Sequence, residues 1–310
     1  MKTYPLDPQY KLLRHFRLPL WRSGSAQLQA AMRLWPCLSD QRTEVCTEQV
    51  AGPDGNSIPV RVIRPRGIRK NAPCLFYIHG GGFYFSSAPY HFTFAKEYAV
   101  RADCVVVYPD YRLAPKYPYP AAAEDCWAAY VWTTEHAQAL GIDLNRIAVG
   151  GDSAGGDLAA VMTLMARDRK AVQPMFQMLI YPVTDRRMET ESSRRYRDAP
   201  VWNTALSEKM WAYYLPKLPA EHIEYASPME APDFTGLPEA YLEVAEFDSL
   251  RDEGLNYAAA LEAAGVKVTR HETRGTPHGF EFVSNAPLTL QTVRHRAEIL
   301  KAAFENASAE

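Results

Sequence analysis

The stretch that decides the fold is IAVGGDSAGGDLAAVMTLMAR, residues 147–167. It opens as a short apolar run that is typical of a buried strand and continues, after a turn, as an alanine- and leucine-rich helical pattern. The turn, residues 151–155, reads GDSAG, and its two glycines let strand and helix approach closely. A serine on such a strand–turn–helix corner is a candidate nucleophile. Ser153 also lies at a helix N-terminus, where backbone N–H groups favour a developing anion.

A purely structural reading of Ser153 is open as well. Serine is a common N-cap, and the glycines beside it could serve close packing alone. The strand–turn–helix context favours the nucleophile, because a strained corner at this point is typical of a functional site.

The alternation of strands and helices extends in both directions from this stretch. Short apolar runs stand at 73–79, 104–110, 146–152, 176–182, 239–246 and 266–272. Helical patterns lie at about 90–102, 120–139, 154–169, 252–264 and 287–306. Strands that are apolar on both faces are typical of a parallel sheet covered by helices. We therefore predict an α/β fold with a central, mostly parallel sheet flanked by helices, preceded by an antiparallel hairpin in residues 41–64.

A glycine run follows the first of these apolar runs. Residues 79–83 read HGGGF, and three consecutive glycines cost considerable chain entropy. Acyl transfer would explain such a loop, because its tetrahedral intermediate carries an oxyanion that fixed backbone N–H groups stabilise. We expect the amides of Gly81, Gly82 and Ala154 to form this oxyanion hole, and His79 to make structural hydrogen bonds. A phosphate-binding loop would need a GxxxxGK or GxGxxG pattern, which this stretch lacks.

Among the eight histidines, His278 is the strongest candidate for a general base. It follows the last predicted strand, where loops hold reactive groups on a rigid support. Asp248 follows the strand predicted at 239–246 and is the candidate acid, although it could also serve as a helix N-cap. The order Ser153, Asp248, His278 is that of the α/β-hydrolase triad, in which the aspartate orients the histidine.

Two segments do not fit the alternation of strands and helices. Residues 7–39 look helical and have no place in the sheet, and the interval at about 185–220 holds a charged stretch and the helical pattern ALSEKMWAYYL. An insertion after the carboxyl end of a strand is where a lid over a site would lie. We expect residues 1–40 and about 185–220 to form a helical cap, and residues 41–310, with that insertion, to form the catalytic domain.

Composition argues against several other classes of protein. The chain has 310 residues, of which 47% are hydrophobic, and a formal net charge of −2, so we expect neither nucleic-acid nor membrane binding. Its five cysteines include no CxxC pair, and we expect Cys74 and Cys104, in or beside apolar runs, to be small buried side chains rather than catalytic thiols. We expect no metal site. The N-terminus lacks a continuous apolar stretch, which predicts no signal peptide and a cytoplasmic protein.

Taken together, these motifs resemble the bacterial hormone-sensitive-lipase-like esterases. The matching segments are HGGG at 79–82, DYRLAP at 110–115, GDSAGG at 151–156, the acid loop at 247–252 and HGF at 278–280. The resemblance spans roughly residues 45–305 and implies an α/β-hydrolase fold with a helical cap. It also implies hydrolysis of a small-molecule carboxylic ester without a cofactor. Many members act on short acyl groups and many associate as dimers, so a short-acyl carboxylesterase and a homodimer are our expectations.

Three positions depart from the family's pattern. Lys116 stands where glutamate usually follows DYRLAP, Ser249 where the acid loop usually has proline, and Asp157 where asparagine is usual. Lys116 removes a salt bridge that would brace the glycine loop. Asp157 is expected to add a negative charge one turn after Ser153.

The nature of the substrate is less constrained than the reaction. Phe83, Tyr84 and Phe85 follow the glycines, and we expect them to line an apolar pocket, unless some of them only pack the loop onto the core. An amidase or deacetylase would use the same triad, because acyl transfer to water does not fix the leaving group. A non-catalytic small-molecule receptor can share the fold, but such proteins typically lose the base, and His278 is present.

Overall fold

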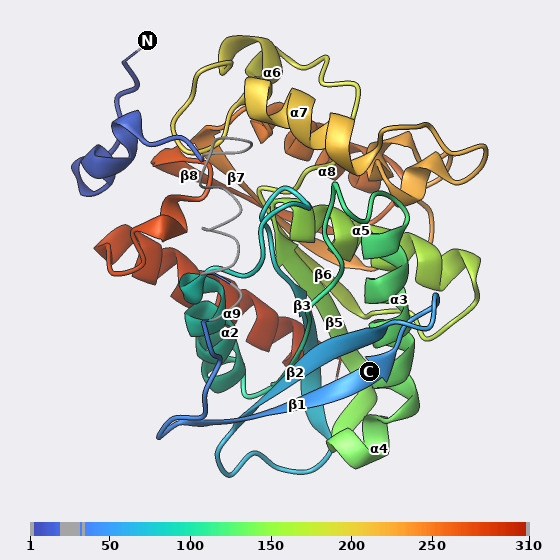
Figure 1. The fold of residues 1–310 in the computed structure, drawn as a ribbon. Coiled ribbons are helices and arrows are strands. Elements are labelled where there is room, and N and C mark those ends of the chain that lie inside the picture. The colour runs from blue at the N-terminus through green and yellow to red at the C-terminus, as the bar shows by residue number, and fades with distance from the viewer. Residues whose placement is uncertain (1–2, 19–31, 33–34, 308–310) are drawn as a thin grey trace.

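The computed structural model describes residues 3–18, 32 and 35–307. Within these residues the strands form one sheet of eight, in the order β1-β2-β4-β3-β5-β6-β7-β8 (Figure 1). The strands are β1 Thr43–Ala51, β2 Ser57–Pro65, β3 Ala72–Ile78, β4 Val105–Pro109, β5 Ile142–Asp152, β6 Phe176–Ile180, β7 Glu239–Phe247 and β8 Val268–Pro277.

Strand directions confirm the predicted class of fold. β2 runs antiparallel to β1 and β4, and the other neighbouring pairs are parallel. β1 and β2 form the predicted hairpin, which turns through Gly55 at a φ of 74°, a value that suits a residue without a Cβ. Because β3 to β8 are parallel, the loops at their carboxyl ends meet at one edge of the sheet.

Helices cover both faces of this sheet (Figure 1). They are α2 Pro89–Arg101, α3 Ala121–Glu135, α4 Ala137–Leu140, α5 Ala154–Asp168, α8 Arg251–Ala263 and α9 Pro287–Asn306. α2 and α9 pack on one face, and α3, α5 and α8 on the other. Along β3, Leu75 and Tyr77 enter one core while Phe76 and Ile78 enter the other, which explains why this strand is apolar at every position. Among the helices described, none is both long and apolar enough to cross a membrane.

The predicted insertion carries two short helices, α6 Glu191–Arg195 and α7 Thr204–Tyr214. The N-terminal segment contacts it through the backbone: the N–H of Leu18 donates to Val201 O at 3.1 Å, and the N–H of Val201 donates to Phe16 O at 2.8 Å. The two segments that we expected to form a cap therefore touch each other. 3-10 segments are η1 Pro8–His15, a helix of eight residues, and the single turns η2 Ile223–Tyr225, η3 Pro228–Glu230 and η4 Phe280–Phe282.

The N-terminal segment is less helical than predicted for residues 7–39. η1 is a 3-10 helix, and it ends at Phe16, whose extended backbone bonds to the insertion instead of continuing the helix. Residue 32 is helical but residues 35–40 are not, in keeping with Pro36, which lacks an N–H for a helix. Residues 19–31 and 33–34 of that prediction lie outside the described residues.

Candidate active site

Three side chains from widely separated segments meet at the carboxyl edge of the sheet. Ser153 follows β5, Asp248 follows β7 and His278 follows β8. His278 Nε2 lies 2.9 Å from Ser153 Oγ, and His278 Nδ1 lies 2.7 Å from Asp248 Oδ2. All three side chains are buried. The structure thus brings the candidate nucleophile, base and acid into one hydrogen-bonded line.

The partner of His278 determines which ring nitrogen carries the proton. A carboxylate only accepts hydrogen bonds, so Nδ1 holds the proton that points at Asp248, and Nε2 presents a lone pair to the hydroxyl of Ser153. Asp248 Oδ1 also accepts from the N–H of Leu250 at 2.9 Å, but Leu250 itself is the N-cap of α8, so the N-cap alternative for Asp248 is wrong. The other oxygen is directed at His278.

The corner at Ser153 has the strained backbone expected of it. Its φ is 56° and its ψ is −120°. A Cβ at Gly155 would collide with the backbone oxygen of Ile78, so only glycine allows α5 to lie this close to β3. Ser153 occupies the N-cap position of α5, yet its side chain makes no capping hydrogen bond. The N-cap alternative is therefore wrong for the hydroxyl, which faces His278 instead.

The glycine loop after β3 turns its backbone toward the same point. φ is 124° at Gly81 and 61° at Gly82, and a Cβ on Gly82 would lie only 2.5 Å from Trp202 Cη2. Among the described residues, the N–H groups of Gly81, Gly82 and Ala154 have no protein acceptor. Both glycines line the same cavity as Ser153. These three amides are thus free to donate to an anionic oxygen.

The DYRLAP segment supports the glycine loop through hydrogen bonds and ring stacking, in place of the salt bridge that the family's usual glutamate would make at position 116. The hydroxyl of Tyr111 donates to His79 O at 2.8 Å, and the N–H of Ala114 donates to Phe83 O at 2.8 Å. The His79 ring stacks on Tyr111 with centroids 4.5 Å apart, and burial lowers the pKa of His79 to about 4. Lys116 is exposed and lies over the ring of Tyr117. His79 is therefore a neutral structural residue, as predicted.

A cavity of about 430 Å³ opens beside Ser153. Its wall is mainly apolar and comes from the N-terminal segment, the glycine loop, the start of α2, the cap insertion and η4. Large side chains in this wall are Phe16, Phe85, Tyr90, Trp202 and Phe282. A cavity of this size and character fits a small organic molecule.

The structure corrects two of the three predicted pocket residues. Phe85 lines the cavity, whereas Phe83 and Tyr84 are absent from its described wall. The ring of Phe83 stacks on Tyr214 of α7 at a centroid distance of 3.7 Å, and Tyr84 packs beside Tyr213 at 6.1 Å. The loop turns at Phe83, where φ is 56°, so consecutive aromatic side chains point in different directions. Phe83 and Tyr84 thus join the glycine loop to α7 of the insertion.

Sequence reasoning missed two titratable residues in the cavity wall, His91 and Asp152. His91 lies on α2 and was given no role, yet its Nε2 is 3.1 Å from Asp152 Oδ2. The position of Asp152, directly before the nucleophile, was the signal that could have singled it out. For His91 no local signal exists, because the two residues are 61 positions apart in the chain.

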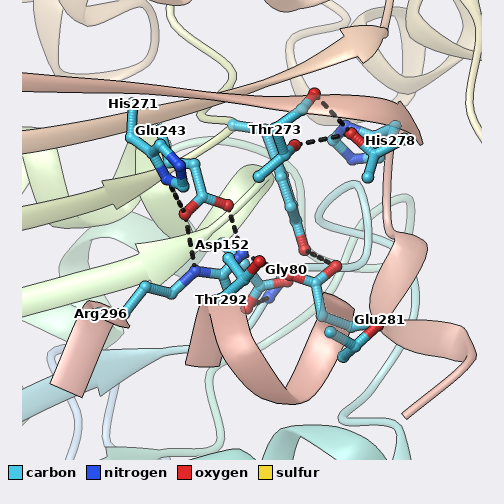
Figure 2. A network of polar contacts seen from close by, with 12 residues as sticks. Gly80, Asp152, Glu243, His271, Thr273, His278, Glu281, Thr292 and Arg296 are labelled. Atoms are coloured by element: carbon cyan, nitrogen blue, oxygen red, sulfur yellow. Dashed lines mark hydrogen bonds and ion pairs between the residues drawn. The ribbon is translucent and has the colours of Figure 1, made fainter. Parts of the chain in front are cut away.

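A buried ionic network lies behind His278 (Figure 2). Arg296 of α9 pairs with Glu243 of β7 and with Glu281 of η4, and the hydroxyl of Tyr181 donates to Glu281 at 2.7 Å. The ring of Tyr181 lies 4.6 Å from that of His278. Burial alone would raise the pKa of Glu243, but the charge of Arg296 and several hydrogen bonds lower it to about 2. The network thus anchors the segment that carries His278.

Possible metal ligands and cysteines are also found outside this site, within the described part of the chain. Among the described residues, no group of three or more His, Cys, Asp or Glu side chains is arranged to hold a metal ion. Cys74, Cys104 and Cys126 are buried and unpaired, and burial raises the pKa of the Cys74 thiol to about 12. These cysteines behave as the small buried side chains that the sequence predicted.

Comparison with known proteins agrees with this geometry. Residues 75–282 match a family described as having the α/β hydrolase fold. The carboxylesterase NlhH of Mycobacterium tuberculosis is 40% identical over 262 residues, 83% of this chain and 82% of that protein. Ethyl acetate hydrolase of Pseudomonas putida is 36% identical over 234 residues, 73% of this chain and 72% of that protein. A bacterial heroin esterase of known structure superposes with a TM-score of 0.86 at 36% identity, covering 97% of this chain and 98% of that one.

The chain therefore belongs to the α/β hydrolase fold family, in its hormone-sensitive-lipase-like branch. Its curated relatives are named as carboxylesterases, esterases and carboxylic ester hydrolases, and its structural neighbours as esterases. The chain is accordingly a carboxylic ester hydrolase, and its substrate is a small-molecule ester.

Proposed function

We propose that this chain is a serine carboxylesterase that hydrolyses short-acyl esters with Ser153 as nucleophile, His278 as base and Asp248 as the orienting acid. One observation carries the proposal. Two hydrogen bonds, 2.9 and 2.7 Å long, join Ser153 Oγ through His278 to Asp248 beside an apolar cavity. This is the arrangement that acyl transfer through a serine requires.

In the first half of the cycle, Ser153 Oγ attacks the ester carbonyl while His278 Nε2 takes the hydroxyl proton. The carbonyl oxygen becomes an oxyanion, to which the amides of Gly81, Gly82 and Ala154 donate. The intermediate collapses as the bond to the alcohol oxygen breaks, and His278 returns the proton to that oxygen. An alcohol leaves, and the acyl group remains on Ser153.

In the second half, a water molecule takes the place of the alcohol. His278 Nε2 removes a proton from the water as its oxygen attacks the acyl carbonyl, and the same amides hold the second oxyanion. Collapse breaks the bond to Ser153 Oγ, which regains its proton from His278. Asp248 stays ionised throughout and stabilises the imidazolium that forms in each half.

The preference for short acyl groups rests on the size of the cavity and on relatives. A space of about 430 Å³ has to hold both the acyl and the alcohol part of an ester. The relative from Pseudomonas putida is named for the hydrolysis of an acetate. Our expectations of a two-part cap, a homodimer, a cytoplasmic location and no nucleic-acid partner stay predictions.

The test is hydrolysis of p-nitrophenyl esters from acetate to palmitate, and of matched p-nitroanilides, by wild type and Ser153→Ala. We expect highest kcat/KM on the short esters and a loss of about 10⁴-fold or more in kcat for Ser153→Ala. Ser87→Ala is the control, because it removes another buried serine hydroxyl, bonded to Tyr108 at 2.8 Å. Unchanged hydrolysis by Ser153→Ala would refute the proposal. Faster turnover of the anilides would favour the amidase alternative.

A further inference from the structure

Asp152 connects three parts of the site. Its Oδ1 accepts from the N–H of Gly80 at 3.1 Å (Figure 2). The same oxygen accepts from the hydroxyl of Tyr77 at 3.0 Å, and Oδ2 lies 3.1 Å from His91 Nε2. These donors belong to the glycine loop, to β3 and to α2. Asp152 itself is the last residue of β5, directly before Ser153. One buried carboxylate therefore ties the nucleophile corner to the elements around it.

The hydrogen bond that His91 makes on its other side determines how it acts on Asp152. Its Nδ1 accepts from the backbone N–H of Ala88 at 2.8 Å, so Nδ1 carries no proton. The proton of the ring is then on Nε2 and points at Asp152 Oδ2. A neutral imidazole in one tautomer holds the carboxylate in one orientation, with Oδ1 left for Gly80 and Tyr77.

The carboxylate is ionised in spite of its burial. Burial alone would raise the pKa of Asp152, but the hydrogen bonds that the carboxylate accepts from His91 and Tyr77 lower it below its usual value. A negative group beside the oxyanion-binding amides works against the charge that develops there. Its three donors offset much of this charge. Asp152 must therefore have a role other than electrostatic stabilisation of the tetrahedral intermediate.

The position of the Gly80 contact indicates that role. Gly80 is the residue before Gly81, whose amide is one of the proposed oxyanion donors, and Asp152 is the residue before Ser153. The hydrogen bond from Gly80 to Asp152 therefore limits the distance between the Gly81 amide and Ser153, because Gly81 and Ser153 each directly follow one of the two bonded residues. A Cβ at Gly80 would collide with Asp152 Oδ2, which explains why this first glycine of the run is required.

We propose that Asp152, oriented by His91, is a positioning residue that holds the oxyanion-binding amides in register with Ser153. The inference rests on the proposed function, because it assumes that Ser153 and those amides act in one reaction. A misplacement of about 1 Å in such a site costs on the order of 10²-fold in rate. The loss of this contact should therefore appear in the chemical step rather than in substrate binding.

The experiment measures kcat and KM for p-nitrophenyl acetate, and the affinity for phenylboronic acid, which forms a tetrahedral adduct with a reactive serine. Asp152→Asn keeps the shape of the side chain, but its amide cannot accept from Gly80 and His91 at once. We expect kcat to fall about 10- to 100-fold, KM to stay within about twofold, and boronate affinity to fall in parallel with kcat.

Three further variants separate positioning from packing. His91→Gln should lower kcat less than Asp152→Asn, and the double variant should be no worse than Asp152→Asn alone, because the two residues act as one unit. Tyr77→Phe removes another donor to Asp152 and should give a smaller loss of kcat. Tyr130→Phe is its matched control, since that hydroxyl bonds to Val172 O at 2.8 Å on the far side of β3.

The outcomes distinguish this inference from the proposed function. An inactive Ser153→Ala together with wild-type kcat and boronate affinity in Asp152→Asn would overturn the inference alone. So would a rise in KM without a fall in kcat, which would make Asp152 a part of the substrate-binding wall. If Asp152→Asn does not fold, His91→Gln decides the question by the same two readouts, and wild-type values there overturn the inference.

Discussion

Two carboxyl groups stand on either side of Ser153, the proposed nucleophile: Asp152 just before it and Asp157 one turn after it. Both are buried. Asp152 has three hydrogen-bond donors, and its pKa is lowered to about 2. Neither oxygen of Asp157 has a hydrogen-bond partner among the described residues, and burial, helped by the nearby charge of Glu253, raises the pKa of Asp157 well above its usual value.

The comparison teaches that partners, more than burial, decide whether a buried carboxyl is charged. It also argues against the expectation that Asp157 adds a negative charge near Ser153, because the unpartnered oxygens and the raised pKa of Asp157 favour the neutral carboxyl. A protonated carboxyl has the shape of the asparagine that the family usually has here and carries no charge. The departure at this position is therefore nearly isosteric, and the charge next to the nucleophile is that of Asp152.

The largest effect is expected where two buried carboxylates depend on one cation. Arg296→Leu leaves Glu243 and Glu281 buried without their shared partner and should lower the free energy of unfolding by about 3–5 kcal/mol. The control is Arg270→Leu, because Arg270 pairs with Glu262 on the surface, where the expected loss is below about 1 kcal/mol. Urea unfolding measures both. Equal losses of unfolding free energy in the two variants would mean that an ion-pair partner matters no more for a buried carboxylate than for an exposed one.

A smaller effect is expected for the stability of Asp152→Asn. The folded pKa of about 2 lies below the unfolded reference of 3.8, so the ionised group stabilises the fold at neutral pH by roughly 2 kcal/mol. That contribution is present above the unfolded pKa and is lost as the pH falls through the folded pKa. The gap in unfolding free energy between wild type and variant should therefore narrow below about pH 4. A gap that does not change with pH would contradict the charged state of Asp152.

The smallest effect, and one of opposite sign, is expected for Asp157→Asn. Because the folded pKa of Asp157 is raised, its contribution is fully present below the unfolded pKa and is lost as the pH rises. The variant should thus be more stable than wild type at pH 7 by roughly 1 kcal/mol and no more stable at pH 4. The gain is modest because a buried amide leaves its own donors unsatisfied. A destabilised variant at pH 7 would show that Asp157 is charged and paired.

Much of the fold and of the candidate site followed from local sequence signals. Most strands could be predicted because they are apolar at consecutive positions, and Ser153 and Asp248 each stand directly after such a run. His278 follows β8, which is more polar and extends further than the predicted run at 266–272. The glycine loop could be predicted because an ordinary turn does not require the three consecutive glycines of HGGG. Each of these predictions needed only a few neighbouring residues.

Contacts between distant segments and side-chain directions in loops could not be predicted in this way. The pair of His91 and Asp152 depends on where α2 packs against β5, which no local pattern encodes. Phe83 and Phe85 differ in exposure to the cavity because of positive φ values at Gly81, Gly82 and Phe83. The N-terminal segment was misjudged because an apolar spacing compatible with a helix competes there with prolines and with backbone bonds to the insertion.

The backbone contact between Phe16, Leu18 and Val201 has an evolutionary consequence. Phe16 and Leu18 line the cavity although they precede the first strand of the sheet. Recombination or point mutation in the opening part of the chain can therefore reshape which esters fit, while the strands that carry the reactive groups are inherited unchanged. Part of the wall that selects the ester is thus encoded apart from the strands that carry the proposed reactive groups.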